Sequence, residues 1–267
     1  MTWDRQITIK SPRELEIMRI AGRINAEALA AAKAIIRPGI TTADLNAAAE
    51  EVMRKYNVYS PFKNYPGPYP YPASTCVSVN DELVHGIPGK RRLKEGDIVS
   101  MDSGVVYEGY VGDSAFTAPV GEVSETAQKL LEVTEKALYI GIEQLRAGNR
   151  VGDVSAAIQQ YVEGNGFFVV REYTGHGVGK RMHEGPQVPN YGLPGRGILL
   201  REGMTIALEP MVLVGTPMTR VYPDEWTVGS ADHSLTAHFE HSVAITKNGP
   251  VILTVTGDNP VESVRLE

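Results

Sequence analysis

The clearest hydrophobic pattern lies near the N-terminus and predicts a helix. From Leu15 to Ile36, apolar residues recur every three or four positions, which is the spacing of one helix face. Ser11, Pro12 and Glu14 stand before this run in the order of a capping box, with proline at the first helical position. A Pro-Gly pair after the run ends the predicted helix.

Two further segments complete this part of the chain. Thr42 is the expected cap of a second helix, which continues through Met53. Residues 61–72 then read PFKNYPGPYPYP, and the prolines remove the donors that regular structure needs. We expect this stretch to form either an ordered cover or a mobile flap.

The chain repeats itself at a nearly constant interval. Arg37-Pro38-Gly39 is matched 109 residues later by Arg146-Ala147-Gly148, where a similar helix pair follows. Asp102 and Glu209 lie 107 residues apart, and each follows the same turn and apolar run. Two similar halves would place these carboxylates opposite each other near a pseudo-twofold axis. The prediction is one domain, 1–267, with halves of roughly 11–120 and 121–255.

Short apolar runs follow each helix pair and predict strands. They cover residues 75–79, 98–101, 105–110, 205–208, 237–245 and 251–255. Helices and strands come in separate runs, without a linker rich in proline or serine between them. This order predicts an α+β fold with helices on one face of a mainly antiparallel sheet.

Composition and charge narrow the classes of function. The 267 residues are 42% hydrophobic and 22% charged, which is an ordinary globular balance. A formal net charge of −6 argues against DNA binding as the main task. Cys76 is the only cysteine, so no intrachain disulfide can form, and a reducing compartment is favoured. Neither a signal peptide nor a long apolar span is visible, so we expect a cytoplasmic protein that does not cross a membrane.

Two aspartates form the first candidate site. Asp102 ends an apolar strand in VSMDSG, and Asp113 lies eleven residues further, in YVGDSAF. A turn near Tyr107-Glu108-Gly109 would bring the two carboxylates side by side. Like charges this close repel each other unless a cation lies between them. Asp102 alone could equally cap a turn, so both interpretations remain open.

Three later residues extend the candidate site. His176 lies between glycines in TGHGVG, and we expect a tight turn that exposes its imidazole, or else a flexible loop with an incidental histidine. Glu209 ends a strand before Pro210 and could be a ligand or an ion-pair partner. Phe239 and Glu240 must face opposite sides of their strand, so Glu240 faces the concave side if Phe239 faces the helices.

The five residues together predict metal-assisted hydrolysis. Carboxylates and imidazole are hard-to-borderline ligands, and four carboxylates carry the charge that two divalent ions balance. Such a pair of ions polarises a carbonyl group and generates hydroxide from water. The sequence has neither a serine nucleophile elbow nor a phosphate-binding loop that would favour other chemistry. The predicted ligands are Asp102, Asp113, His176, Glu209 and Glu240.

These motifs, in this order, resemble the methionine aminopeptidases of type I. The resemblance extends from about Ser11 to Val255 and lacks the N-terminal zinc-finger extension of some members. It also includes VNDELVHGIP, GHGVG followed by His183, LEP at Glu209 and FEH at Glu240, with no large insertion between His183 and Glu209.

The resemblance implies a pita-bread fold, which is two pseudo-symmetric halves around a curved antiparallel sheet with two divalent ions at its centre. Asp113 and Glu240 would bridge the ions, Asp102 would hold one, and His176 and Glu209 would hold the other. Manganese, iron, cobalt and zinc all suit these ligands. The implied reaction removes the N-terminal methionine of a nascent polypeptide whose second residue is small.

The resemblance also implies roles around the metal ions. His85 would contact the substrate and stabilise the tetrahedral state, His183 would contact the scissile amide, and Glu209 would help to move a proton. A methionine pocket favours polarizable and aromatic walls, although ordinary core packing would explain the same residues. The candidate pocket residues are Tyr71, Cys76, Met182 and Trp226.

Several alternatives accompany this hypothesis. His238 and His241 flank Glu240. His238 lies two residues before Glu240 and therefore shares its face, but we assign both histidines a structural role. Met182 stands where type I members often have phenylalanine. A related peptidase that cleaves before proline, or a non-catalytic relative that binds partners, would share the fold. We expect a monomer that acts on nascent N-termini, with ribosome contact left open.

Overall fold

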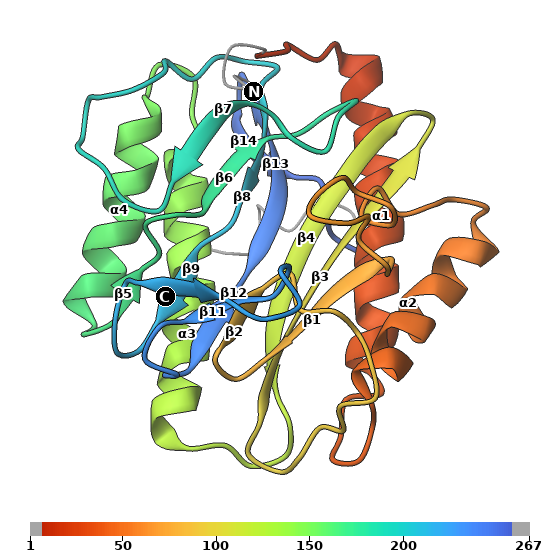
Figure 1. The fold of residues 1–267 in the computed structure, drawn as a ribbon. Helices are drawn as coiled ribbons and strands as arrows, with labels where there is room; N and C mark the ends of the chain where they lie inside the picture. The colour runs from red at the N-terminus through yellow and green to blue at the C-terminus, as the bar shows by residue number, and fades with distance from the viewer. Residues whose placement is uncertain (1–6, 258–267) are drawn as a thin grey trace.

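The computed structural model describes residues 7–257, which fold into four helices and fourteen strands (Figure 1). The helices are α1 (Pro12–Lys33), α2 (Thr42–Lys55), α3 (Glu125–Gln144) and α4 (Val151–Gly164). The strands are β1 (Thr75–Val79), β2 (Glu82–Val84), β3 (Ile98–Tyr107), β4 (Tyr110–Pro119), β5 (Phe168–Val169), β6 (Thr174–Gly177), β7 (Glu184–Pro189), β8 (Thr205–Leu208), β9 (Met211–Leu213), β10 (Thr219–Val221), β11 (Val228–Ser230), β12 (Thr236–His238), β13 (Glu240–Thr246) and β14 (Gly249–Ile252).

The first two helices begin with reciprocal caps. Ser11 and Glu14 form the predicted capping box, and α1 ends at Lys33, three residues before the predicted end. The predicted cap of α2 is one residue too late. Thr41, not Thr42, accepts a hydrogen bond from the Asp44 amide, because its extended backbone places the hydroxyl over the first turn.

One sheet of eight strands organises the described residues. Its order is β1-β3-β4-β13-β8-β6-β7, with β14 paired to β13, and all of these pairs are antiparallel. In Figure 1, α1 and α2 flank β1, β3 and β4, whereas α3 and α4 flank the other end of the sheet. One continuous core joins both helix pairs to the sheet, which confirms the predicted α+β class.

The helix positions reproduce the spacing of the sequence repeat. Helices α2 and α4 are each 14 residues long, and their first residues lie 109 positions apart. Helices α1 and α3, which precede them, are 22 and 20 residues long. The boundary between the two halves near residue 120 stays a prediction.

The predicted break after Asp102 is wrong. A single ten-residue strand, β3, runs through Tyr107, and the hairpin turns at Glu108-Gly109 as predicted. The ladder pairs Asp102 with Ala115 and Gly104 with Asp113, so backbone pairing continues past the carboxylate. Asp102 therefore lies inside a strand, where hydrogen bonds on both sides fix its direction.

The predicted strand 237–245 is also interrupted, and the last strand is displaced. Phe239 separates β12 from β13, which belong to different sheets. Phe239 packs in the core while Glu240 faces the cavity, so their predicted opposite directions are confirmed. The predicted strand 251–255 is β14, Gly249–Ile252, because its register with β13 ends at Val243.

Helix α1 approaches β4 closely at a pair of glycines. A Cβ on Gly112 would lie 2.5 Å from the Gly22 nitrogen, and a Cβ on Gly22 would lie 2.3 Å from the Leu253 carbonyl oxygen. Both glycines are therefore required by backbone contact. Asp113 follows Gly112 directly, so this contact sets how deep the carboxylate lies.

We expect Gly22→Val to destabilise the protein by at least about 1–3 kcal/mol, the usual cost of overpacking a filled core. Gly164→Ala is the matched control, because nothing lies within 4 Å of its added Cβ and alanine favours a helix. Urea unfolding of both variants measures the difference. Equal stability of the two variants would contradict the role assigned to this contact.

Candidate metal centre and its cavity

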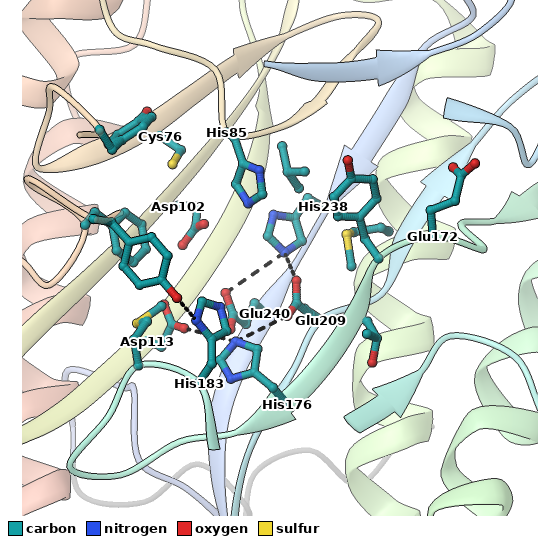
Figure 2. A pocket seen from close by; sticks show the side chains of 18 of the residues that line it. Cys76, His85, Asp102, Asp113, Glu172, His176, His183, Glu209, His238 and Glu240 are labelled. Carbon is teal, nitrogen blue, oxygen red and sulfur yellow. Dashed lines mark hydrogen bonds and ion pairs between the residues drawn. The ribbon is translucent and has the colours of Figure 1, made fainter. Parts of the chain in front are cut away.

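A cavity of about 330 Å³ opens over the central strands of the large sheet, β4 and β13 (Figure 2). Strands β1, β3, β4, β6 and β13 supply side chains to it, as do the segments that adjoin β2, β7 and β8. Ten of the eleven predicted site residues line this cavity, and they are Tyr71, Cys76, His85, Asp102, Asp113, His176, Met182, His183, Glu209 and Glu240.

Strand register places three of the carboxylates around one small residue. Ala115 on β4 pairs with Asp102 on β3 and with Glu240 on β13, so these three side chains form a row across the sheet. Asp113 lies two residues before Ala115 and therefore on the same face. The predicted closeness of Asp102 and Asp113 arises as a diagonal pair on this face, and not as directly opposed residues.

His176 approaches the same cluster from the opposite end of the sheet, in β6. The expectation of an exposed turn is wrong, because His176 is 4% exposed within a strand. Its glycine neighbours serve close strand packing: a Cβ on Gly175 would lie 2.7 Å from the Ala207 oxygen, and one on Gly177 would lie 2.1 Å from the Gly185 oxygen.

The imidazole of His176 is oriented as a ligand. Its Nδ1 lies 2.9 Å from the Gly177 carbonyl oxygen, which assigns the proton to Nδ1 and the lone pair to Nε2. Nε2 lies 3.7 Å from Asp113 Oδ2 and 3.5 Å from Glu209 Oε1. Glu209 comes directly after β8, as predicted for a strand-end carboxylate.

The electrostatics of the cluster favour a cation. Burial, reinforced by the charge of Glu209, raises the pKa of Asp102 to about 7. Burial and the neighbouring carboxylates also raise the pKa values of Asp113 and Glu240 well above their usual range, and burial raises that of Glu209. Four ionised carboxylates would therefore be unfavourable here without positive charge.

The hydrogen-bond pattern gives an independent indication. One buried oxygen each of Asp102, Asp113 and Glu240 has no hydrogen-bond partner within the described residues. Ligand atoms of Asp113, His176 and Glu240 lie within 4.8 Å of one another. Buried polar atoms are rarely left unpaired, and oxygen atoms with one imidazole nitrogen suit divalent metals. The residues present therefore fit a metal ion.

Two more histidines of the cavity come from irregular backbone. His85 follows β2 with φ of 60°, and its ring lies edge-on to Tyr173 and Trp226. His183 precedes β7, and its Nδ1 lies 2.7 Å from the Tyr65 hydroxyl oxygen. Burial lowers the pKa of both imidazoles to about 4, and the fields of His238 and His183 contribute at His85. Both rings are therefore neutral at neutral pH.

Sequence reasoning missed two residues of the cavity. His238 was assigned a structural role, yet it lines the cavity with Nε2 3.5 Å from Glu209 Oε2 and 4.0 Å from Glu240 Oε2. Its position two residues before Glu240 was the signal for a shared direction. Tyr65 gave no such signal, because its contact with His183 spans 118 residues.

One wall of the cavity is apolar and agrees largely with the predicted pocket. Tyr71, Cys76 and Met182 line it, and hydrogen bonds within residues 64–71 make the proline-tyrosine stretch an ordered cover. Trp226 does not line the cavity. It lies behind Tyr71, with ring centroids 5.1 Å apart, because the backbone at Gly67 covers its six-membered ring.

The chain is similar to one group of known proteins over most of its length. Residues 16–247 match the model of metallopeptidase family M24. The methionine aminopeptidase of Clostridium acetobutylicum is 52% identical over 93% of this chain and 99% of that protein, and methionine aminopeptidase 1 of Bacillus subtilis is 51% identical over the same shares.

Solved structures give the same picture. The methionine aminopeptidase of Thermotoga maritima superposes with a TM-score of 0.91 at 49% identity, over 93% of this chain and 99% of that chain. The prolidase of Pyrococcus furiosus superposes with a TM-score of 0.74 at 25% identity, over 94% of this chain and 66% of that chain. No helix among the described residues is long and apolar enough to cross a membrane.

We expect the cluster to bind two divalent ions per chain, and Mn²⁺ or Co²⁺ should raise the melting temperature. Binding at about 100 times Kd would stabilise the native state by about 2.7 kcal/mol. Calorimetric titration and thermal unfolding measure both effects. A chelator should reverse the stabilisation and leave the protein folded, because its core is large.

Asp113→Asn should lose most of this metal-dependent stabilisation. Glu172→Gln is the control, since Glu172 lines the cavity but lies apart from the carboxylate cluster in Figure 2. Equal metal binding by Asp113→Asn and the unaltered protein would remove Asp113 from the ligand set. Cooperative unfolding on chelation at room temperature would show that the metal is structural instead.

Proposed function

This chain belongs to metallopeptidase family M24 and to its methionine aminopeptidases, and from that premise we propose that its cavity removes the N-terminal methionine of peptides whose second residue is small. The observation that carries this proposal is the group of unpaired, buried carboxylate oxygens at the base of a cavity with one apolar wall. Such a base suits metal-assisted hydrolysis, and such a wall suits a thioether side chain.

We propose that five residues hold two divalent ions. Asp113 and Glu240 lie at the centre of the cluster and would bridge them, Asp102 would hold one, and His176 and Glu209 would hold the other. Their arrangement around Ala115 supports this division, since Asp102 and His176 approach from opposite ends of the sheet. When bound, the ions supply a Lewis acid for the scissile carbonyl and an acidified water.

The protein's own side chains would then orient the peptide and move its protons. A Glu209 carboxylate oxygen would accept the proton of the attacking water and pass it to the leaving amine. Neutral His85 would donate a hydrogen bond to the developing oxyanion. The Tyr65 hydroxyl, whose pKa burial raises, remains a donor to His183 Nδ1. This contact would assign the imidazole proton of His183 to Nε2, from which it would donate to the scissile amide.

The apolar wall would select the first residue of the substrate. Tyr71 is held by its hydroxyl, which donates to the Gly86 carbonyl oxygen at 2.9 Å. Cys76 lies directly opposite Asp102 in the strand register, so the pocket adjoins the metal ligands. A second residue would pass close to the cluster, where only a small side chain has room.

Two other functions are compatible with this fold. Prolidase structures share it, but this chain covers only 66% of the Pyrococcus furiosus prolidase. Its sequence identity to that prolidase is 25%, against 52% to the methionine aminopeptidase of Clostridium acetobutylicum. A non-catalytic relative would be expected to lose ligands, whereas all five candidate ligands are present. Both observations favour removal of methionine.

We also propose a cellular setting for this reaction. Nascent polypeptide N-termini in the cytoplasm are the substrates that the activity requires, and the enzyme would act on them as a monomer. Contact with the ribosome would bring it to such N-termini. Sedimentation of the protein with and without ribosomes tests both statements.

Cleavage of four peptides with one common tail tests the proposed function. Met-Ala should have the highest kcat/KM, and Met-Lys should be at least about 100-fold poorer, because a clash adds to the roughly 1–3 kcal/mol lost per mismatched methylene. Leu-Ala and Ala-Pro complete the set. If Ala-Pro is cleaved best, the proline-directed function is correct, and if no peptide is cleaved with any divalent ion, the non-catalytic alternative is.

His85→Ala should lower kcat by about 100-fold or more, because it removes the donor to the developing oxyanion. Metal stoichiometry should stay unchanged, since His85 is not among the proposed ligands. Steady-state kinetics together with metal analysis of the purified variant measure the two quantities. Near-normal turnover would show that the assigned role of His85 is wrong.

A further inference from the structure

The segment from Ile7 to Lys10 lies against the loop that carries Met182 and His183. Ile7 forms a parallel bridge with Gly185, and the Lys10 amide donates to the Gly203 carbonyl oxygen at 2.8 Å. The segment thus contacts Gly185, two residues after His183, and also the turn that precedes β8. We call residues 7–10 the N-terminal strap.

A buried ion pair joins the strap to this loop. Lys10 Nζ lies 2.8 Å from Glu184 Oε2, and the two side chains are only 4% and 2% exposed. The Thr8 hydroxyl also donates to Glu184, and the Arg181 amide donates to Glu184 Oε1 at 3.2 Å. The Lys10 stem crosses Gly179 so closely that a Cβ there would lie 2.6 Å from Lys10 Cε.

Glu184 and His183 are neighbours that point in opposite directions. Glu184 begins β7 and is absent from the cavity lining, whereas His183 lines the cavity. His183 lies just outside the strand and directly precedes Glu184, so the position of Glu184 restrains the backbone that carries His183. His183 also contacts Tyr65 on the far side of the cavity, and its ring centroid lies 4.4 Å from that of His176.

Stability alone does not account for this ion pair. Removing two charges from water is unfavourable, and well-packed apolar side chains of similar volume often stabilise a protein as much or more. An ion pair differs in that it demands one geometry. Its place directly behind His183 therefore indicates a positioning role.

We propose that the Lys10–Glu184 pair positions the loop of Met182 and His183 for the substrate, so that the N-terminal strap sets both turnover and the choice of the first residue. This inference rests on the proposed function, because it needs His183 and Met182 to meet the peptide. Lys10 and Glu184 act through their neighbours and are positioning residues.

Two variants separate positioning from stability. Lys10→Met leaves the Glu184 carboxylate buried without its partner and should destabilise the fold. The double variant Lys10→Met/Glu184→Leu replaces the pair by apolar packing and should recover the melting temperature. We expect kcat/KM for Met-Ala to remain lowered by about 10-fold or more in both, because small displacements of reacting groups cost rate steeply.

The preference for Met-Ala over Leu-Ala is the decisive kinetic measurement. This ratio does not depend on how much of the enzyme is folded, so a purely structural role would leave it unchanged, whereas displacement of Met182 should reduce it. Lys129→Met is the matched control, since Lys129 is an exposed lysine on α3 that donates to the Asn165 carbonyl oxygen.

A readout without catalysis distinguishes this inference from the proposed function. The imidazole nitrogen resonances of His183, assigned with His183→Gln, should shift in both strap variants and stay constant in Lys129→Met. Absence of cleavage by the unaltered protein would overturn the proposed function, while shifted resonances would still support positioning. Unshifted resonances or a fully restored double variant would overturn the positioning role.

Discussion

The burial of four carboxylates that face one another is the constraint on which the rest of the structure depends. Asp102, Asp113, Glu209 and Glu240 lose much of their hydration, and several of their oxygens gain no hydrogen bond in return. Protonation would relieve the repulsion, and the raised pKa values show this tendency. Divalent ions relieve it while keeping the carboxylates ionised. The arrangement that is costly without metal is therefore the one that binds metal well.

Such a cluster needs a scaffold that cannot relax to separate the charges. The row of Asp102, Ala115 and Glu240 is held by three neighbouring strands, whose ladder fixes each side chain's face. Behind these strands, α1 contacts β4 through Gly22 and Gly112 at backbone distance, which prevents β4 from moving outward. The tightly packed core thus keeps the carboxylates together despite their mutual repulsion.

The fold class and most of the candidate site could be predicted from the sequence, and the reasons for the misses are specific. Apolar periodicity located α1 and β1, and superposition on the Thermotoga maritima structure confirms the pita-bread fold. Asp102 was misplaced at a strand end because Gly104 suggested a turn. The glycine is instead needed within the strand, because a Cβ there would lie 2.9 Å from Cγ of Pro61. The roles of the site residues stay predictions. Tyr65 and the Lys10–Glu184 pair were invisible, because contacts across 118 and 174 residues leave no local pattern.

The backbone around the cavity divides into regular and irregular parts with different consequences. Most of the proposed metal ligands lie on strands of one sheet, whereas most of the groups that would meet the peptide, Cys76 on β1 excepted, lie outside regular structure. His85 has a left-handed backbone, His183 adjoins a register shift between β6 and β7, and Tyr71 ends a proline-rich cover. Irregular segments can change without disturbing the sheet. The prolidase of Pyrococcus furiosus, with a TM-score of 0.74 at 25% identity, shows that this fold persists while most of the sequence differs.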